Sequence, residues 1–578
     1  MKTYIFLIWT IILFSFVSRL TNLATMDEVL FVSACEQIAK TWKPMMDFSN
    51  SSNVDTLWHP PLYQYIVAIF ISMFGSYVDT LIIFRIIQLI FFISSVMILM
   101  GILANVKLIK IGKSSDFHLL LPLVLINPFI LQSILLIDMD NNLLFFTITI
   151  FLKILFHNNI SHKYKIILLI FSFSLSLFTK ITTPLILPLI SFFYFLKNLK
   201  LFKAVISSSI IFINGYILFA FNYYIFCEVT GGDFYWTFSW VFSHLGLVES
   251  PQLADKSNVD INILLYLKIR IVDAMNHIMW ISLRATPYVF ISLIIYFKIW
   301  LNQRNKIEIN KTILLIIFSI ITISMYSLIK GQVFGFTKYE GLAIAIILTI
   351  VLIEFLKMKN NLLTEINSPG FIIFGIVSFL YFVSIQDPVS SASAIIPSID
   401  GTKKLVIKLL YYNFLYLIPS IMLVIYIYTF KKKKINEGFV FRLMVYLLLL
   451  SSSSVTVKHG FSDYSTTYYH GESLSDKREI IDYLANNKHD NSISYLRKDI
   501  GYYSFGAFGW VPGRNMYTDY KLTKNKLIQD KPKFVLISAK NNGFKINLFL
   551  DEYYDLFKDL DYTIVFKKND FILFENNL

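Results

Sequence analysis

Charged residues are scarce in this chain of 578 residues. They make up 16% of the sequence, whereas an ordinary globular domain contains about 25%. Hydrophobic residues make up 56% and aromatic residues 17%. A chain so poor in charge and so rich in apolar side chains is too apolar to be a soluble protein, so the composition indicates a membrane protein.

Cysteine is also scarce, because the sequence contains only Cys35 and Cys227. Their separation excludes a metal site built from closely spaced cysteines. Both residues fall on the outer side of the topology predicted below, where a disulfide between them is allowed. The first apolar run, 4–17, lacks a small-residue cleavage site after it, so we interpret this run as an uncleaved helix.

Apolar runs long enough to cross a bilayer recur from Tyr4 to Leu450. The run 62–74 is too short, since it covers only about 20 Å of a hydrocarbon core of about 30 Å. We place it in the membrane interface. The remaining runs predict an α-helical polytopic membrane protein with about thirteen transmembrane helices, at about 4–17, 80–103, 119–137, 143–156, 166–178, 184–195, 204–226, 278–300, 313–328, 343–356, 371–385, 405–430 and 439–450.

Lysine and arginine lie mainly in short loops between these runs, as the positive-inside rule expects. The loops are 107–113, 163–165, 197–203, 304–311, 357–359 and 431–434. The formal net charge of +14 therefore indicates an orientation in the membrane, and nucleic acid is not an expected partner. We expect a multi-pass protein of the cytoplasmic (plasma) membrane, with a cytoplasmic N-terminus and, because thirteen is odd, an extracytoplasmic C-terminal end.

The composition becomes polar and mixed after Leu450. We expect a membrane domain over 1–455, with a first outer loop over 21–78, and a small soluble α/β domain over 456–578. In this domain, Asp476 with Glu479 predicts the start of a helix over 477–484. Alternating patterns predict strands over 492–496, 534–538, 562–566 and 571–575. The aromatic segment 502–510 contacts the membrane, a sugar or the domain core.

Five short polar features fall on the outer side of the predicted topology. They are Asp27-Glu28, His59-Pro60-Pro61, Asp138-Met139-Asp140-Asn141, Thr179-Lys180 and Lys338-Tyr339-Glu340. Ionisable residues that gather at one membrane depth from distant segments are typical of a polar cavity. Each feature taken alone is also compatible with an interface anchor, and the two lysines with side chains that snorkel to the headgroups.

The motifs around these residues resemble those of the GT-C membrane glycosyltransferases, in particular the protein O-mannosyltransferases and the lipid A aminoarabinose transferases. The resemblance covers the membrane part, and the family often has an outward C-terminal domain. Two departures are Ile181 after Thr-Lys, where the family has glycine, and the presence of two aspartates in the second acidic loop. The matching segments are Asp27-Glu28, His59–Tyr63 with a short helix ending in Phe74-Gly75, Phe84-Arg85, 138–146, Thr179-Lys180 with Pro184, and Lys338-Tyr339.

The resemblance implies an enzyme that moves a sugar, with inversion, from a polyprenyl-phosphate carrier to a hydroxyl acceptor on a lipid, a glycan or a protein. The acceptor hydroxyl must lose its proton, and we expect the carboxylate of Asp27 to take it, with Glu28 as the rival. We expect Asp138 or Asp140 to orient the acceptor or to hold Mg²⁺ or Mn²⁺, while a metal requirement stays open.

The leaving lipid phosphate needs a positioned cation. Lys180 is the main candidate, with Arg85, Lys338 and Tyr339 as further substrate-binding residues. His59 would donate a hydrogen bond to the phosphate or the acceptor, or else have a structural role.

Two other functions are compatible with the sequence. A transporter or flippase of lipid-linked sugars would have paired repeats with broken helices, and we find no such repeat. An oligosaccharyltransferase or polymerase would take a whole glycan from a lipid diphosphate, which favours a metal site. The long first outer loop and the large outer domain favour the transferase over the transporter.

Overall fold

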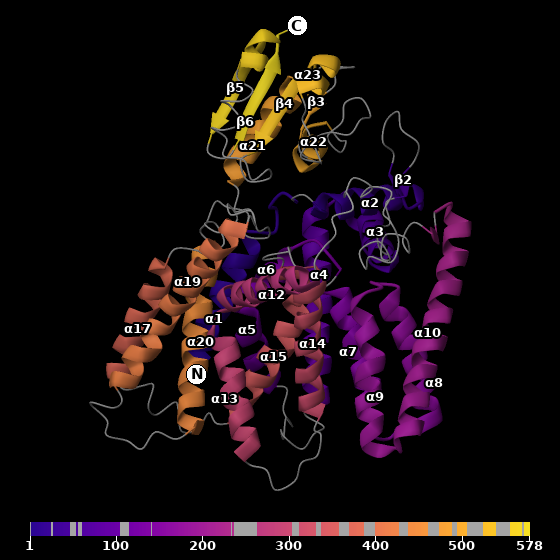
Figure 1. The fold of residues 1–578 in the computed structure, drawn as a ribbon, viewed down its shortest axis with the longest axis vertical. Helices are drawn as coiled ribbons and strands as arrows, with labels where there is room; N and C mark the ends of the chain where they lie inside the picture. Colours follow the sequence, from indigo (N-terminus) through magenta and orange to yellow (C-terminus); the bar gives the residue numbers. More distant parts are fainter. Residues whose placement is uncertain are drawn as a thin grey trace.

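The computed structural model is mostly helical and carries a small sheet near the C-terminus, above a bundle of helices (Figure 1). It describes residues 2–24, 27–46, 54–55, 60–103, 115–139, 141–232, 234–235, 263–302, 311–330, 337–357, 369–385, 399–426, 437–460, 473–487, 494–496, 498–505, 524–538, 555–568 and 571–577.

The helices before residue 461 form the bundle and its upper rim in Figure 1. Two short strands, β1 (Met45–Met46) and β2 (Val54–Asp55), pair antiparallel between α2 and α3. The helices are α1 (Lys2–Val17), α2 (Asp27–Thr41), α3 (Leu62–Phe74), α4 (Thr80–Leu103), α5 (Ser115–Leu125), α6 (Pro128–Leu135), α7 (Leu143–Phe156), α8 (His162–Leu177), η2 (Thr183–Leu185), α9 (Ile186–Asn198), α10 (Leu201–Thr230), α12 (Ile263–Ala285), α13 (Tyr288–Asn302), α14 (Lys311–Lys330), α15 (Thr337–Lys357), α17 (Pro369–Ser384), α19 (Ile399–Tyr426) and α20 (Glu437–Gly460).

Two of the predicted spans are broken in the structure. The run 119–137 divides at Asn127-Pro128 into α5 and α6, because Pro128 begins a new helix and the Asn127 side chain accepts a hydrogen bond from the Phe129 amide at 3.1 Å. The run 278–300 divides before Tyr288 into α12 and α13, which meet at 98°. In Figure 1, α6 and α12 lie across the bundle rather than along it.

Long apolar helices make the chain an integral membrane protein. Within the described ranges, four helical segments are long and apolar enough to cross a bilayer, or five if the bent pair of α12 and α13 is one span. The others include shorter apolar helices such as α3, α7 and α14. The count of about thirteen spans stays a prediction. The four segments are Thr80–Leu103, Leu201–Thr230, Ile407–Ile425 and Glu437–Lys458.

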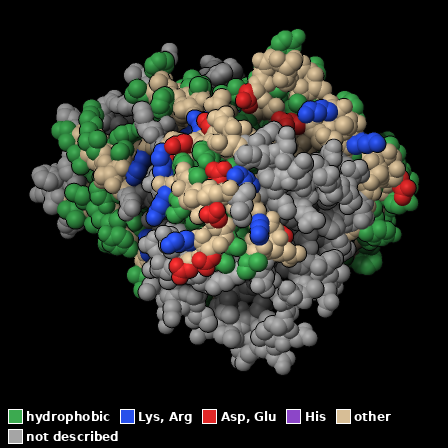
Figure 2. Space-filling model, turned by 90° about the horizontal axis from the view of Figure 1, so that it is seen from above, with side chains coloured by type: hydrophobic (Ala, Val, Ile, Leu, Met, Phe, Trp, Pro, Cys, Tyr) green, Lys and Arg blue, Asp and Glu red, His purple; other side chains and the backbone are tan. Residues whose placement is uncertain are grey.

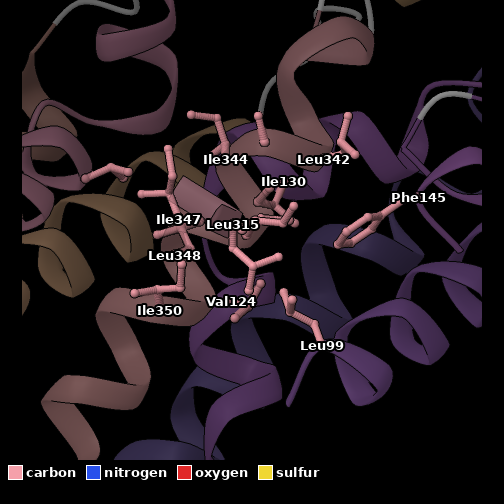
Figure 3. Close-up of a cluster of buried hydrophobic side chains, with 14 of the residues drawn as sticks. Leu99, Val124, Ile130, Phe145, Leu315, Leu342, Ile344, Ile347, Leu348 and Ile350 are labelled. Carbon is pink, nitrogen blue, oxygen red and sulfur yellow. The ribbon is translucent and has the colours of Figure 1, made fainter. Parts of the chain in front are cut away.

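The core of the bundle lies where α4, α5, α6, α7, α14 and α15 meet (Figure 3). Residues 342–353 of α15 are buried all around the helix, as expected for a helix enclosed by others. A separate cluster, which includes Val29 of α2, Tyr63 of α3 and Phe84 of α4, packs around Ile137 at the upper rim. This second cluster supports the candidate site.

The C-terminal domain contains a four-stranded sheet with the order β3-β4-β6-β5. β3 and β4 are parallel, β4 and β6 are antiparallel, and β5 and β6 form a hairpin with an irregularity between Ile564 and Phe566. The predicted α/β class and hairpin are therefore present. The elements are α21 (Leu474–Asn486), β3 (Ser494–Tyr495), α22 (Lys498–Phe505), α23 (Lys524–Asp530), β4 (Phe534–Ser538), β5 (Tyr562–Lys568) and β6 (Phe571–Asn576).

Three details differ from the sequence predictions. The first helix of this domain is capped by Ser473, whose hydroxyl accepts from the Asp476 amide at 3.3 Å, so the predicted cap at Asp476 is wrong. The helix α20 continues through the predicted domain boundary to Gly460. Cys35 and Cys227 are both buried, and the allowed disulfide between them is not formed.

The face that carries the C-terminal domain is polar near its middle. Figure 2 shows Lys, Arg, Asp and Glu side chains gathered there and hydrophobic side chains at the left and right rims. The connection between α9 and α10, with Lys200, lies at the opposite end of the bundle in Figure 1. The domain, α2 and α3 therefore share one end of the molecule.

Candidate functional site

The helix α3 follows the His-Pro-Pro motif and begins at its last proline. Pro61 occupies the N-cap position, and the helix ends at Gly75, whose amide bonds to the Ile71 carbonyl at 2.7 Å. Tyr63, Gln64 and Val67 are buried, because they form the face of α3 that packs on α2 and α4. The helix has the bounds that the sequence predicts, and His59 lies outside the described residues.

The second acidic segment, residues 136–142, is called the acidic loop here. Its backbone is held by α4, since Gln88 Nε2 donates to the carbonyls of Leu136 at 2.7 Å and Asp138 at 3.0 Å. Asn142 caps α7 through its side chain and also donates to the Asp138 carbonyl. Asp138 is buried, and Asp140 lies outside the described residues.

Glu28 joins the first acidic pair to the acidic loop. Its Oε1 accepts a hydrogen bond from the Ile137 amide at 2.8 Å, across 109 residues of sequence. The side chain is buried, so this carboxylate is engaged with the protein itself. The backbone of Asp27 begins α2, while its side chain is not described. The two features that the sequence placed on one side are therefore neighbours.

Arg85 is fully buried beneath these two segments. Its guanidinium donates to the Leu135 carbonyl at 3.1 Å, to the Asn22 carbonyl at 2.7 Å and to the Leu20 carbonyl. These contacts tie the connection between α1 and α2 to the start of the acidic loop. They give Arg85 a scaffold role through at least three of its five N–H donors, and its predicted role in substrate binding stays a prediction.

Lys180 lies in the turn between α8 and η2. The side chain is buried, and the Lys180 amide bonds to the Ser176 carbonyl at 3.1 Å. The Leu62 amide, at the start of α3, bonds to the Phe178 carbonyl at 3.4 Å. The turn that carries Lys180 is thus in direct contact with the start of α3, directly after Pro61.

Tyr63 connects these two halves of the site. It is fully buried, and its ring contacts Phe31 of α2 and Phe84 of α4. Burial raises the pKa of the Tyr63 hydroxyl well above its usual range, and the nearby carboxylates of Asp138 and Glu28 raise it further. The hydroxyl is therefore a neutral donor close to both acidic segments. The motif His-Pro-Pro-Leu-Tyr contained this residue, but no role was predicted for it.

The segment Lys338-Tyr339-Glu340, at the start of α15, also lies near the acidic loop. Lys338 and Tyr339 lie in the first turn of α15, and their side chains are not described. Two residues on, Gly341 packs so closely against Asn141 that an added Cβ would lie 2.3 Å from its Oδ1. The helix start therefore lies next to the acidic loop, at a place where a larger residue than glycine would displace the Asn141 side chain.

A buried pair that sequence reasoning missed supports this helix start. His277 Nε2 of α12 lies 2.6 Å from Glu340 Oε1 of α15, and both side chains are buried. The apolar-run criterion placed the start of a span at Ile278 and so left His277 outside it. A histidine beside an asparagine in an otherwise apolar segment was the available signal, since intramembrane ionisable residues mark functional sites by default.

Metal binding was left open by the sequence. Among the described residues, no three His, Cys, Asp or Glu side chains gather as a metal site. The side chains of Asp27, Asp140 and His59 are not among the described ones. The Mg²⁺ or Mn²⁺ site stays a prediction.

Comparison with solved structures settles the fold. The chain covers 98% of the crystal structure of ArnT from Cupriavidus metallidurans bound to undecaprenyl phosphate, over 99% of its own length, with a TM-score of 0.51 and 11% sequence identity. The fold is that of ArnT. ArnT is a lipid A aminoarabinose transferase of the GT-C type, so the fold expected from the motif resemblance is confirmed.

The apo crystal structure of the same ArnT aligns over the same shares of both chains, with a TM-score of 0.48 and 12% identity. No protein-family model and no curated protein matches the sequence. At these identities the likeness to ArnT establishes the architecture, and the chemistry has to be argued from this chain's own residues.

Proposed function

We propose that this protein is a membrane glycosyltransferase that moves a sugar from a polyprenyl-phosphate carrier to a hydroxyl acceptor on the outer face. The observation that carries the proposal is the hydrogen bond from the Ile137 amide to Glu28, which joins two acidic segments from distant parts of the chain. The start of α3, the Lys180 turn and the start of α15 lie around this junction. The ArnT structure with undecaprenyl phosphate supports the class of donor.

The proposed reaction needs a base, a cation and an oriented acceptor. The acceptor oxygen forms a bond to the anomeric carbon, and the bond from that carbon to the phosphate oxygen breaks with inversion. The acceptor's proton goes to a carboxylate, and the electron pair leaves with the lipid phosphate. We assign the base to Asp27 rather than Glu28, because Glu28 is buried and already accepts a backbone hydrogen bond.

The leaving phosphate gains negative charge, which a positioned cation stabilises. We assign this role to Lys180, and Lys338 and Tyr339 remain candidates because their helix start adjoins the acidic loop. Asp138 or Asp140 would orient the acceptor. The proposal also includes the orientation with a cytoplasmic N-terminus, because the lysine-bearing connection between α9 and α10 and the C-terminal domain lie at opposite ends of the bundle.

The test uses purified protein in detergent with a labelled polyprenyl-phosphate sugar and an extract of cell-envelope acceptors. Asp27→Asn keeps the size of the side chain and removes its basicity, so transfer should fall about a hundredfold or more. Asp482→Asn, on an exposed position of α21, is the matched control and should transfer normally. Equal transfer by Asp27→Asn and the control would refute the assignment of the base.

The same protein in vesicles discriminates the other functions. Movement of the labelled lipid across the bilayer without transfer would favour a flippase. Transfer only from a lipid-diphosphate glycan would favour an oligosaccharyltransferase or polymerase.

A further inference from the structure

The C-terminal domain contacts the membrane part through two adjacent tyrosines. Tyr502 and Tyr503 belong to α22, at the lower side of the domain and above α2 in Figure 1. The Tyr502 hydroxyl donates to Oε2 of Glu36 on α2. The Ala24 amide, just before α2, donates to the Tyr503 hydroxyl at 2.9 Å. The sequence predicted that this aromatic segment contacts the membrane, a sugar or the domain core; Tyr503 does pack on the domain core, and both tyrosines also contact the membrane part.

The rings of both tyrosines are part of the apolar cluster at the site. They pack against the group of residues that contains Ala24, Val29 and Tyr63. Tyr503 also packs against the core of the C-terminal domain. One side chain therefore belongs to both cores, so the domain is connected to α2 by packing as well as by hydrogen bonds.

The connection that leads into α2 is held from both sides. From below, Arg85 donates to the carbonyls of Leu20 and Asn22. From above, Tyr503 accepts from the Ala24 amide. Asp27 begins α2 three residues after this contact, and Glu28 reaches Ile137 at 2.8 Å. The start of α2, with Glu28, therefore follows a backbone segment, residues 20–24, that both the membrane part and the C-terminal domain hold.

We propose that Tyr502 and Tyr503 are positioning residues, through which the C-terminal domain fixes α2 so that Glu28 reaches the acidic loop. The effect that we expect on the rate of sugar transfer rests on the proposed transferase function. Both tyrosines act through α2, and neither contacts a reacting atom in this scheme.

The hydrogen bond between the Tyr502 hydroxyl and Glu36 persists at neutral pH, as a contact that holds α2 in place must do. Burial raises the pKa of the Tyr502 hydroxyl well above its usual range, and the charge of Glu36 raises it further. The hydroxyl therefore stays a donor to the carboxylate at neutral pH. Reacting groups must be held in near-attack geometry, and a shift of about 1 Å can reduce a rate about a hundredfold.

The test removes only the two hydroxyls. Tyr502→Phe and Tyr503→Phe, singly and together, keep the rings and their packing. The matched control is Tyr483→Phe, because Tyr483 donates to Glu575 Oε2 at 2.6 Å between α21 and β6 within the C-terminal domain. The control loses the same kind of tyrosine–carboxylate bond, but not one that reaches α2.

Two readouts on the full chain in detergent are compared. The first is hydrogen exchange of backbone amides, where the double variant should exchange faster across residues 20–41 and the control should not. The second is transfer kinetics, where kcat should fall about tenfold or more in the double variant, with KM for the polyprenyl-phosphate sugar unchanged. The control should keep both kcat and KM.

The outcomes separate the two proposals. If wild-type protein transfers no sugar, the proposed function fails, and the exchange data still report whether the tyrosines fix α2. Unchanged exchange over residues 20–41 in the double variant would overturn the positioning role. Faster exchange with unchanged kcat would also overturn it, because the tyrosines would then hold α2 without affecting the reaction.

Discussion

Gly341 is the position where a single methyl group should disturb the site. An added Cβ would lie 2.3, 2.5 and 2.8 Å from Oδ1, Cγ and Nδ2 of Asn141. All three atoms belong to the side-chain amide of Asn141, which is buried, so this amide has to turn away within a packed site. Gly341→Ala should therefore displace the Asn141 side chain from its place in the acidic loop. Gly101 of α4 is the matched control, because an added Cβ there meets nothing within 4 Å.

The expected changes in stability have opposite signs in Gly341→Ala and Gly101→Ala. Alanine in place of glycine within a helix stabilises by about 0.5–1 kcal/mol, and Gly101→Ala should show at most this gain. Overpacking a buried site costs about 1–3 kcal/mol, which outweighs the gain at Gly341. The two variants should thus differ by about 1–3 kcal/mol in stability, and Gly341→Ala should also lose sugar transfer by about tenfold or more.

Thermal unfolding in detergent can be followed with a thiol-reactive dye, because Cys35 and Cys227 are buried and form no disulfide. Gly341→Ala should melt below wild type, and Gly101→Ala at or above it. Adding Asn141→Ala to Gly341→Ala removes the clashing amide and should raise the melting temperature again, as expected for residues in direct contact. If Gly341→Ala is as stable and as active as Gly101→Ala, the close approach of α15 to the acidic loop is wrong.

Three further predictions concern cations and topology. Lys180→Ala should weaken binding of polyprenyl phosphate roughly ten- to a hundredfold, as for a charge-assisted hydrogen bond, while the exposed control Lys200→Ala binds normally; equal affinities would make Lys180 an interface anchor. Arg85→Lys should lower the melting temperature strongly, since losing two hydrogen bonds of a buried charged group costs about 3 kcal/mol or more; an unchanged melting temperature would contradict the scaffold role. In a cysteine-free background, Asp482→Cys should react with an impermeant thiol reagent from outside and Lys200→Cys should not; the reverse result would invert the topology.

Segments whose length and end signals agree were predictable from the sequence. α3 and α7 have the predicted bounds, Leu62–Phe74 and Leu143–Phe156, because proline, glycine or asparagine stands at their ends. β4 also has its predicted bounds, Phe534–Ser538. In these cases the local pattern and the tertiary structure favour the same element.

Breaks within long apolar runs were missed for a physical reason. Hydropathy measures transfer into the membrane and does not register a change in helix direction. The runs that contain Asn127-Pro128 and Thr286-Pro287 both bend there. A residue before proline is biased away from the helical region, so the two dipeptides were the available signal.

The site was predictable as a set of segments, but not as a set of side-chain roles. Membrane sidedness placed Glu28, Asp138 and Lys180 at one end of the molecule, and the structure gathers their segments there. Sequence does not show that Glu28 accepts from Ile137, or that Arg85 is occupied by backbone carbonyls. The pairing of His277 with Glu340 also depends on tertiary contact between α12 and α15.

The central claim is that this membrane protein transfers a sugar and releases polyprenyl phosphate. The most direct measurement gives purified protein a doubly labelled polyprenyl-phosphate sugar and an envelope acceptor, then counts released lipid phosphate against glycosylated product. We expect one lipid phosphate per transferred sugar, inverted anomeric configuration in the product, and loss of both signals in Asp27→Asn. Intact donor after prolonged incubation with every acceptor class, whether lipid, glycan or protein, would contradict it.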